Sequence, residues 1–231
     1  MNGYSKIKSF AKINLALNVL GKSLSIHKIE SIVSFLGLND EIFVKEINKN
    51  KHIIKFIGKF SKNIGKINTI SKLLEILDKK NLLKDKKYAI KIKKNIPTQA
   101  GLGGGSMNAA TFFKYLIKKQ KIKISQKKIG EISNFVGSDV ILGMYCKNLI
   151  LKSNGSINII SNVESKNVLV IKPNFGCSTK KIYSKVKKFN SSRFKKPNKK
   201  LFSYLELKKM SNDLEIIALR IYPKLKLLKV F

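Results

Sequence analysis

The chain has 231 residues, 43% of them hydrophobic, which is enough for one large domain or two small ones with a buried core. Its formal net charge is +35, from 48 Lys and Arg against 13 Asp and Glu, and all but two of the cations are lysines spread along the whole length. Because base recognition in nucleic acids favours arginine, we do not expect a nucleic-acid partner, although the positive field should favour anionic ligands such as nucleotides.

The rarer residue types exclude further classes of protein. The two cysteines, Cys146 and Cys177, and the two histidines form no close cluster, which excludes a zinc motif. No apolar run approaches the roughly 18 residues of a membrane span, and the N-terminus lacks the apolar core of a signal peptide. We therefore expect a reduced, soluble, cytoplasmic protein that does not enter a membrane, as a monomer or a homodimer.

The first elements are predicted as strands, because apolar and polar residues alternate in them. Residues 13–19 form one such segment, and residues 53–57 form another. Between them, residues 35–38 and 42–44 predict two strands that are joined by a turn at Asn39-Asp40-Glu41. A helix should then start at Asn68, which is a suitable N-cap, and a further strand should cover residues 88–93.

Residues 96–110 are rich in glycine and lead directly into a helix that should reach about Lys119. Four glycines in five positions, Gly101, Gly103, Gly104 and Gly105, allow left-handed backbone and close approach to a ligand. Together with the unpaired amides and the dipole of the helix start, they predict a phosphate site. The alternatives are a flexible linker or a tight turn. The spacing excludes a P-loop and the dinucleotide fingerprint.

Asp139 is the next residue with a chemical signal. It follows a helix that Ser125 should cap and Gly137 should end, and it precedes the apolar residues 140–142. A carboxylate at such a position is either the N-cap of a helix or a functional group in a partly buried site, and the residues alone do not decide between these two roles.

The last third of the chain predicts shorter elements. Asn154-Gly155 indicates a hairpin between residues 149–151 and 157–159, and residues 168–171 predict a strand. A helix should begin at Ser178 or Thr179, and another should begin near Asn212. Between them, the polar and basic residues 190–200 predict a mobile loop.

The glycine-rich loop, from Pro97 to Ala110, resembles the second signature of the GHMP kinases, a superfamily of small-molecule kinases. The resemblance implies that ATP is the co-substrate, with Mg²⁺, and that the loop wraps the ATP phosphates. The ATP-binding residues that it implies are Pro97, Thr98, Gln99, Ala100, Gly101, Leu102, Gly103, Gly104, Gly105, Ser106 and Met107. Ser106 is also a candidate magnesium ligand. Asn68 corresponds to an asparagine near the adenine, although an N-cap role alone would explain it.

Two further segments, Ala11-Lys12-Ile13-Asn14-Leu15 and Gly137-Ser138-Asp139-Val140, are similar to signatures of one GHMP branch, the 4-diphosphocytidyl-2-C-methyl-D-erythritol kinases. The resemblance implies that Lys12 and Asp139 are catalytic. It also implies that the substrate carries cytidine diphosphate and contacts Asn14, His27, Thr179 and Tyr183. Without it, Lys12 and His27 would be ordinary surface residues, and Tyr183 could equally be a core aromatic.

The resemblance also implies an α+β two-layer fold with two parts. Residues 1–150 would form the N-terminal GHMP kinase domain, whose architecture is like that of a ribosomal protein, and residues 151–231 a smaller C-terminal α/β domain. Because no glycine follows Gly176, the family's third glycine-rich segment is absent, and we expect a truncated product or a shortened enzyme. The expected activity is ATP-dependent phosphorylation of the substrate's 2-hydroxyl in non-mevalonate isoprenoid biosynthesis. The alternatives are another GHMP kinase, of the homoserine or mevalonate type, or an inactive nucleotide- or RNA-binding relative.

Overall fold

The computed structural model describes residues 3–23, 26–194 and 196–229. By their contacts, these residues form two compact units. The first unit consists of the chain up to Lys12, Leu36–Thr98 and Leu102–Cys146, and the second of Ile13–Phe35, Gln99–Gly101 and the chain from Lys147. Each unit is therefore discontinuous in sequence, because two segments of the first half of the chain pack with the last third.

Two long, mutually paired strands, β1 (Ser5–Ser23) and β2 (Ile26–Ile47), contribute to both units. In the first unit, the end of β2 runs antiparallel to β4 (Lys87–Lys93), and β4 pairs in parallel with β3 (Ile53–Ile57). The predicted strands at 13–19, 53–57 and 88–93 are thus confirmed.

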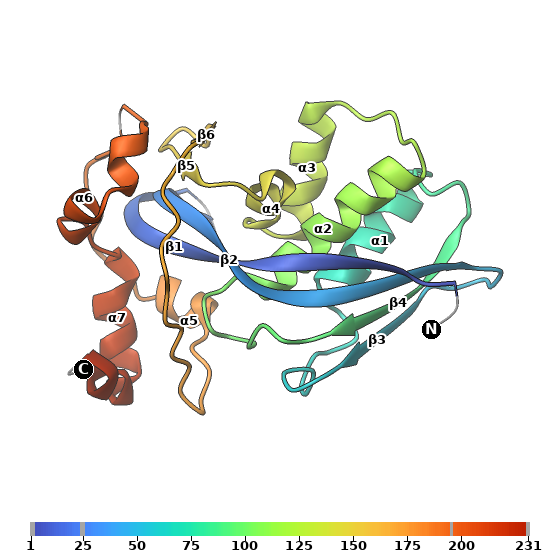
Figure 1. Cartoon of the computed structure of the whole chain (residues 1–231), viewed down its shortest axis with the longest axis horizontal. Helices are drawn as coiled ribbons and strands as arrows, with labels where there is room; N and C mark the ends of the chain where they lie inside the picture. Colours follow the sequence, from blue (N-terminus) through green and yellow to red (C-terminus); the bar gives the residue numbers. More distant parts are fainter. Residues whose placement is uncertain (1–2, 24–25, 195, 230–231) are drawn as a thin grey trace. The chain divides into compact units, whose positions relative to one another are not determined.

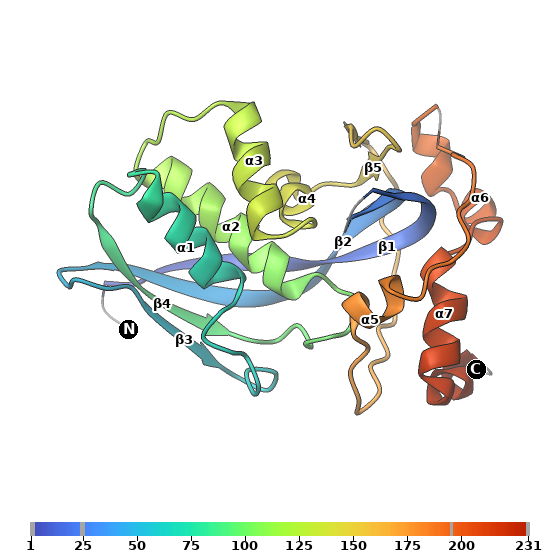
Figure 2. The ribbon, with the colours of Figure 1, turned by 180° about the vertical axis from the view of Figure 1, so that it is seen from behind.

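Four helices cover one face of these strands in the first unit, as both views show (Figures 1 and 2). They are α1 (Thr69–Lys79), α2 (Gly104–Lys119), α3 (Gln126–Val136) and α4 (Val140–Tyr145). One apolar core joins the helix layer to the sheet, and its members include Ile42, Ile90, Leu73, Phe112 and Ile132. This is the two-layer α+β arrangement that was expected for the N-terminal half.

The predicted turn at Asn39-Asp40-Glu41 is wrong, because β2 continues through these residues as one strand. Asp40 is completely buried there, and its carboxylate accepts the backbone N–H groups of Asn95 and Ile96 at 2.7 and 2.8 Å. These hydrogen bonds satisfy a charged group that would otherwise favour an exposed turn.

The second unit is built from short elements. The predicted hairpin is formed by β5 (Leu149–Leu151) and β6 (Ile157–Ile159), and β5 pairs with the first part of β2. The helices that follow are α5 (Thr179–Tyr183), η1 (Lys199–Phe202), α6 (Tyr204–Lys208), α7 (Asp213–Ile221) and η2 (Pro223–Lys229). A small core includes Ala16, Ile32, Ile150, Phe194 and Phe202. Phe194 comes from the predicted mobile loop, so the core fixes this part of the loop.

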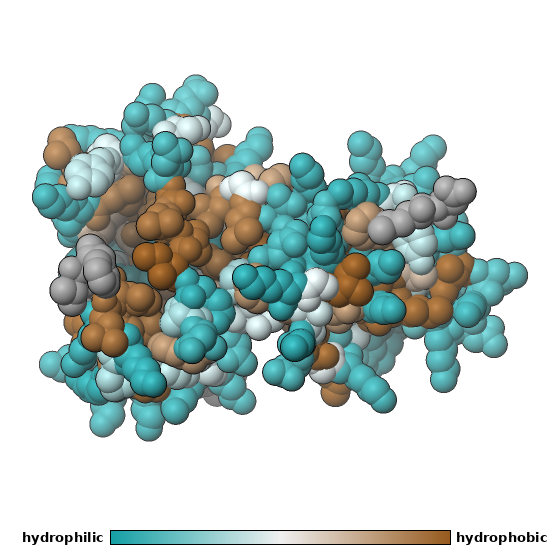
Figure 3. Space-filling view, turned by 60° about the horizontal axis from the view of Figure 1, so that its bottom comes forward, coloured by the Kyte–Doolittle hydropathy of each residue, from teal (hydrophilic) through white to brown (hydrophobic). Residues whose placement is uncertain are grey.

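Residues 168–171 do not form the predicted strand. A strand needs a neighbour that completes its hydrogen-bond ladder, and no strand of the described residues pairs with this segment. Leu169 is 85% exposed as a result. Figure 3 shows the apolar side chains that lie open on this unit, at the left of the view.

The local signals for helix starts are confirmed. Asn68, Ser125, Ser178 and Asn212 are all N-caps whose side chains accept backbone N–H groups of the helices that they precede. Across the described ranges, no helix combines the length and the apolar character that crossing a bilayer requires.

Candidate active site

The glycine loop enters α2 through a left-handed residue. Gly103 is the N-cap with φ +65°, and Gly101 has φ +72°. A Cβ on Gly103 would lie 2.9 Å from Cγ of Lys12, so this position needs a glycine both for its backbone angle and for space. The first amides of an α-helix lack intrahelical partners and lie at the positive end of its dipole, which makes this helix start suited to an anion.

Lys12 and Asp139 meet in the first unit. Nζ of Lys12 is 3.2 Å from Oδ2 of Asp139, and their side chains are 7% and 30% exposed. The backbone N–H of Lys12 donates to the carbonyl of Leu102 at 3.1 Å, which fixes β1 against the loop. Asp139 does occupy the N-cap position of α4, but its side chain makes no capping hydrogen bond in the described structure. The interaction that orients the Asp139 carboxylate is therefore the ion pair with Lys12, and not a capping hydrogen bond to α4.

Ser106 lies in the first turn of α2 and is half-buried. Its Oγ would be 3.6 Å from a Cβ built on Gly137, so the hydroxyl lies beside the segment that leads to Asp139. Magnesium in nucleotide sites is usually held by few protein oxygens together with phosphates and waters. The Ser106 hydroxyl is one protein oxygen of the kind that fits this pattern.

Asn68 uses its side chain to cap the start of α1. Its Oδ1 accepts the backbone N–H groups of Ile70 and Ser71, and its Nδ2 donates to the carbonyls of Gly65 and Lys66. The N-cap role is thus observed, while the contact with adenine stays a prediction.

The residues predicted to hold the cytosine ring lie in the second unit. The rings of His27 and Tyr183 are 5.0 Å apart and tilted by 39°. His27 Nε2 is buried and has no hydrogen-bond partner among the described residues, and burial, with Lys22 as a second cause, lowers the pKa of this histidine. A buried ring nitrogen that lacks a partner beside an aromatic ring is suited to a polar, planar ligand.

The other two substrate residues also belong to the second unit. Thr179 is exposed at the first position of α5, one turn before Tyr183. Asn14 donates from Nδ2 to Oγ of Ser31 at 2.7 Å, and this hydroxyl donates to the carbonyl of Ala16. Asn14 is therefore held in place by the strand beside it.

The chain is similar in sequence and in fold to known kinases. Residues 68–147 match the model of the GHMP kinases N terminal domain. The chain is 55% identical to the 4-diphosphocytidyl-2-C-methyl-D-erythritol kinase of Pelagibacter ubique over 100% of its own length and 82% of that protein. It is 33% identical to the enzyme of the same name from Clostridium botulinum, over 96% of this chain and 81% of that one. The chain belongs to this kinase family. A crystal structure of 4-(cytidine 5'-diphospho)-2C-methyl-D-erythritol kinase has the same fold, with a TM-score of 0.68 and 21% identity, covering 97% of this chain and 81% of that one.

The kinase family's loop is divided between the units in this chain. Gln99–Gly101, at the loop tip, belong to the second unit, where the N–H of Cys177 donates to the carbonyl of Gln99 at 2.9 Å. A Cβ on Gly176 would lie 2.8 Å from Cβ of Gln99, so a glycine is needed there. Thr98 and Gln99 are exposed, and Pro97 and Ala100 are half-buried.

Two residues of the predicted ATP-binding set are buried. Leu102 is 7% exposed and Met107 is 1% exposed. The backbone N–H of Met107 donates to the carbonyl of Gly103 at 2.9 Å, which closes the first helical turn. Their side chains support the loop from the core side, and a direct contact with ATP stays a prediction for both.

The structure also adds a loop contact that the sequence did not indicate. Oγ1 of Thr69 donates to the carbonyl of Gly105 at 2.7 Å and so joins the start of α1 to the start of α2. Only its place next to the Asn68 cap could have pointed to this threonine.

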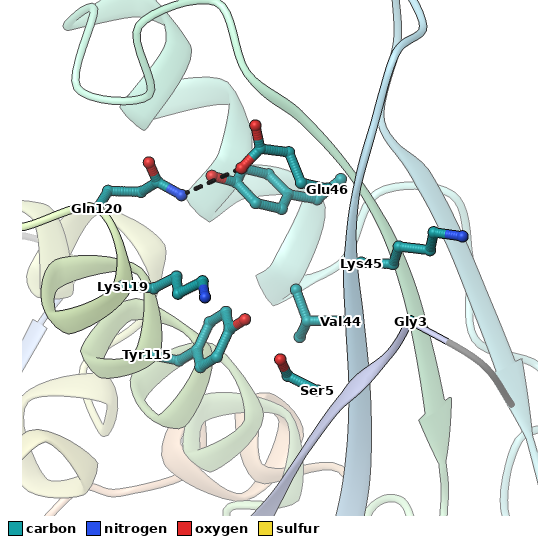
Figure 4. A pocket seen from close by; sticks show the side chains of 9 residues that line it. Gly3, Ser5, Val44, Lys45, Glu46, Tyr115, Lys119 and Gln120 are labelled. Carbon is teal, nitrogen blue, oxygen red and sulfur yellow. Dashed lines mark hydrogen bonds between the residues drawn. The ribbon is translucent and has the colours of Figure 1, made fainter.

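A pocket of about 250 Å³ lies elsewhere in the first unit, near the C-terminal end of α2. Figure 4 shows Tyr115 and Lys119 of α2 on one side of it and Ser5 and Val44 of the strands on the other. Its lining, among the described residues, includes none of the residues predicted for catalysis or for ATP. The candidate active site is therefore defined by Lys12, Asp139 and the start of α2, and not by this cavity.

Proposed function

We propose that this chain catalyses the ATP-dependent phosphorylation of the 2-hydroxyl of 4-diphosphocytidyl-2-C-methyl-D-erythritol, a step of non-mevalonate isoprenoid biosynthesis. The observation that carries the proposal is the Lys12–Asp139 pair, which shares one compact unit with the glycine-capped start of α2. The relative that is named 4-diphosphocytidyl-2-C-methyl-D-erythritol kinase supports the proposal, because it is 55% identical to this chain and the chain spans 82% of its length.

Phosphoryl transfer depends mainly on positioning and on stabilising charge. In the proposed mechanism, backbone amides at the start of α2 bind the β- and γ-phosphates. Asp139 accepts the proton of the attacking hydroxyl, and Lys12 orients this carboxylate and stabilises charge on the oxygen. The 3.2 Å between the two groups is short enough for the lysine to fix the carboxylate in one orientation.

Magnesium would be held by the Ser106 hydroxyl together with the nucleotide, and it would supply neutralisation of the phosphate charge. The position of the Ser106 hydroxyl, beside the chain that leads to Asp139, supports this proposed role.

Recognition of the cytidine end would fall to the second unit. Tyr183 would stack on the base, and His27 would offer the buried ring nitrogen that lacks a partner in the described structure. Asn14 and Thr179 would contact the remainder of the substrate. We further propose that the protein works in the cytoplasm, as a monomer or a homodimer, without a nucleic-acid partner.

The decisive experiment is a coupled assay of ADP release with magnesium-ATP and the cytidyl substrate, run in parallel with homoserine and mevalonate. Turnover with the cytidyl substrate alone is the expected result. Preference for homoserine or mevalonate would assign the chain to another GHMP activity. If no substrate is turned over, and RNA binds with a strong salt dependence while ATP gives no thermal stabilisation, the kinase assignment is wrong.

A further inference from the structure

The first unit contains a buried charge cluster that the proposed mechanism does not use. Asp40 is 0% exposed in the middle of β2, and Lys94, at 3% exposure, places its ammonium against Oδ2 of this aspartate. Oδ1 of Asp40 accepts the N–H groups of Asn95 at 2.7 Å and of Ile96 at 2.8 Å. Asn95 and Ile96 lie where the chain enters the glycine loop, so the carboxylate holds the entry to the loop.

The same carboxylate also holds the chain that leaves the loop. Nδ2 of Asn108, in the second turn of α2, donates to Oδ2 of Asp40 at 3.0 Å. Nζ of Lys94 lies 3.2 Å from the place where a Cβ of Gly104 would be, against the first residue of α2. Both ends of the loop are thus joined to one side chain on a neighbouring strand.

We propose that Asp40 is a positioning residue for the phosphate loop: it fixes the end of β4 relative to the start of α2, and so sets the geometry of the amides between them. The proposal rests on the proposed function of this loop as the ATP-phosphate site. Buried ion pairs contribute little net stability compared with apolar residues, because desolvation offsets most of their attraction. A role in stability alone would therefore not require a charged cluster, whereas one carboxylate offers two oxygens that both accept, and so can hold both ends of a loop at once.

The chain supplies a matched control on the same strand. Glu30 is also 0% exposed on β2, and its carboxylate accepts hydrogen bonds from Nδ2 of Asn18, Oγ of Ser192 and the backbone N–H of Arg193. It anchors a loop too, but in the second unit and far in sequence from the glycine loop. Removing its charge tests what the loss of a buried carboxylate does to stability alone.

The experiment compares Asp40→Asn, Asn108→Ala and Glu30→Gln in the full chain. Three quantities are measured: the thermal midpoint, hydrogen exchange of the amides at 99–106 without nucleotide, and the separate KM values for ATP and the cytidyl substrate. We expect Asp40→Asn to speed exchange in the loop and to raise the KM for ATP about tenfold, as for one lost hydrogen bond to a charged group. The KM for the cytidyl substrate should change little.

Asn108→Ala keeps the Asp40–Lys94 pair and removes only the link to α2, so it decides the matter if Asp40→Asn fails to fold. It should shift loop exchange and the KM for ATP in the same direction, with a smaller loss of stability. Glu30→Gln should lower the thermal midpoint without either effect. The proposal is overturned if the variants of Asp40 and Asn108 lower stability while loop exchange and the KM for ATP stay at wild-type values. Faster loop exchange in a protein whose wild type does not bind ATP would leave the positioning role standing and remove the proposed function instead.

Discussion

The two units of this chain differ in how firmly they hold the residues assigned to them. In the first, Lys12, Asp139 and the start of α2 rest on a core that joins four helices to the sheet. In the second, Tyr183 ends a helix of five residues, and the buried cluster around Phe194 is small. The chemistry proposed for this chain, which depends on sub-ångström positioning, would thus lie on the part with the larger core, and the proposed recognition of a base on the part with the smaller one.

The largest effect should come from the chemical step in the first unit. Asp139→Asn removes the proposed base but keeps its size and its place at the start of α4, so kcat should fall about 10²–10⁴-fold while both KM values change little. Steady-state kinetics on the purified variant measure this. Glu131→Gln, which neutralises an exposed carboxylate on α3, should have wild-type kinetics. Near-normal turnover in Asp139→Asn would remove this residue from the mechanism.

The difference in packing can be measured directly. Phe112 is completely buried in the first core, so Phe112→Ala should reduce the free energy of unfolding by about 3–5 kcal/mol. Phe194→Ala empties a site in the smaller core, which can collapse more easily, and we expect a smaller loss. Chemical denaturation of both variants gives the values. Equal losses would contradict the contrast between the two units.

The next effect concerns the substrate recognition that is proposed for the second unit. Tyr183→Ala should weaken binding of the cytidyl substrate by about 1–3 kcal/mol, as expected for one lost base–aromatic contact, while the KM for ATP stays constant. The control is Tyr204→Ala, since this tyrosine is 67% exposed at the start of α6. Isothermal titration with the substrate distinguishes the two variants. An unchanged affinity in Tyr183→Ala would make this residue a packing aromatic.

The loop itself offers a matched pair of glycines. Gly103→Ala places a side chain at φ +65° and against Lys12, and should cost about 1–3 kcal/mol of stability together with ATP affinity. Gly130→Ala lies within α3 where a Cβ meets nothing within 4 Å, so it should stabilise the protein by about 0.5–1 kcal/mol. Thermal unfolding with and without ATP separates these outcomes. Tolerance of Ala at 103 would mean that the loop is not constrained as described.

The sequence predicted those features of the fold that local chemistry decides. The caps at Asn68 and Ser125 were found because a side chain of the right type stands next to a helical pattern. Asp40 was misread because Asn-Asp is a turn signal, while the groups that satisfy its carboxylate lie more than 50 positions further along the chain. Residues 168–171 have the composition of a strand, but pairing depends on a neighbour that composition does not supply.

The candidate site shows the same division. The glycine loop could be identified from its own residues, because left-handed positions next to a helix start have few other uses. Lys12 could not, since one lysine among so many carries no local signal, and only the resemblance to a kinase family selected it. Thr69 and Asn108 act through contacts with residues distant in sequence, at Gly105 and Asp40, which no spacing rule reveals.

The smallest expected effect concerns a histidine in the first unit that the proposed function does not involve. Nδ1 of His52 accepts the backbone N–H of Tyr88 at 3.0 Å, so the neutral ring carries its proton on Nε2, 3.1 Å from Asp78. Burial is the main cause that lowers the pKa of His52. Asp78 opposes this effect by stabilising the protonated ring, and the positive charge of Lys87 lowers the pKa to a smaller extent. Because the folded protein then binds this proton less readily than the unfolded chain, stability from this site is complete above pH 6.5 and is lost as the pH falls below it.

The comparison of thermal midpoints at pH 7.5 and 5.5 in the wild type and in His52→Asn isolates this contribution. Asn keeps an oxygen that can accept the N–H of Tyr88 but does not titrate, so the drop in midpoint on acidification should be smaller in the variant. His27, whose pKa is also lowered by burial, is present in both proteins and cancels from the difference. If acid lowers both midpoints equally, His52 takes up its proton at the same pH in the folded and unfolded chains, and the hydrogen bond to Tyr88 does not hold the ring neutral.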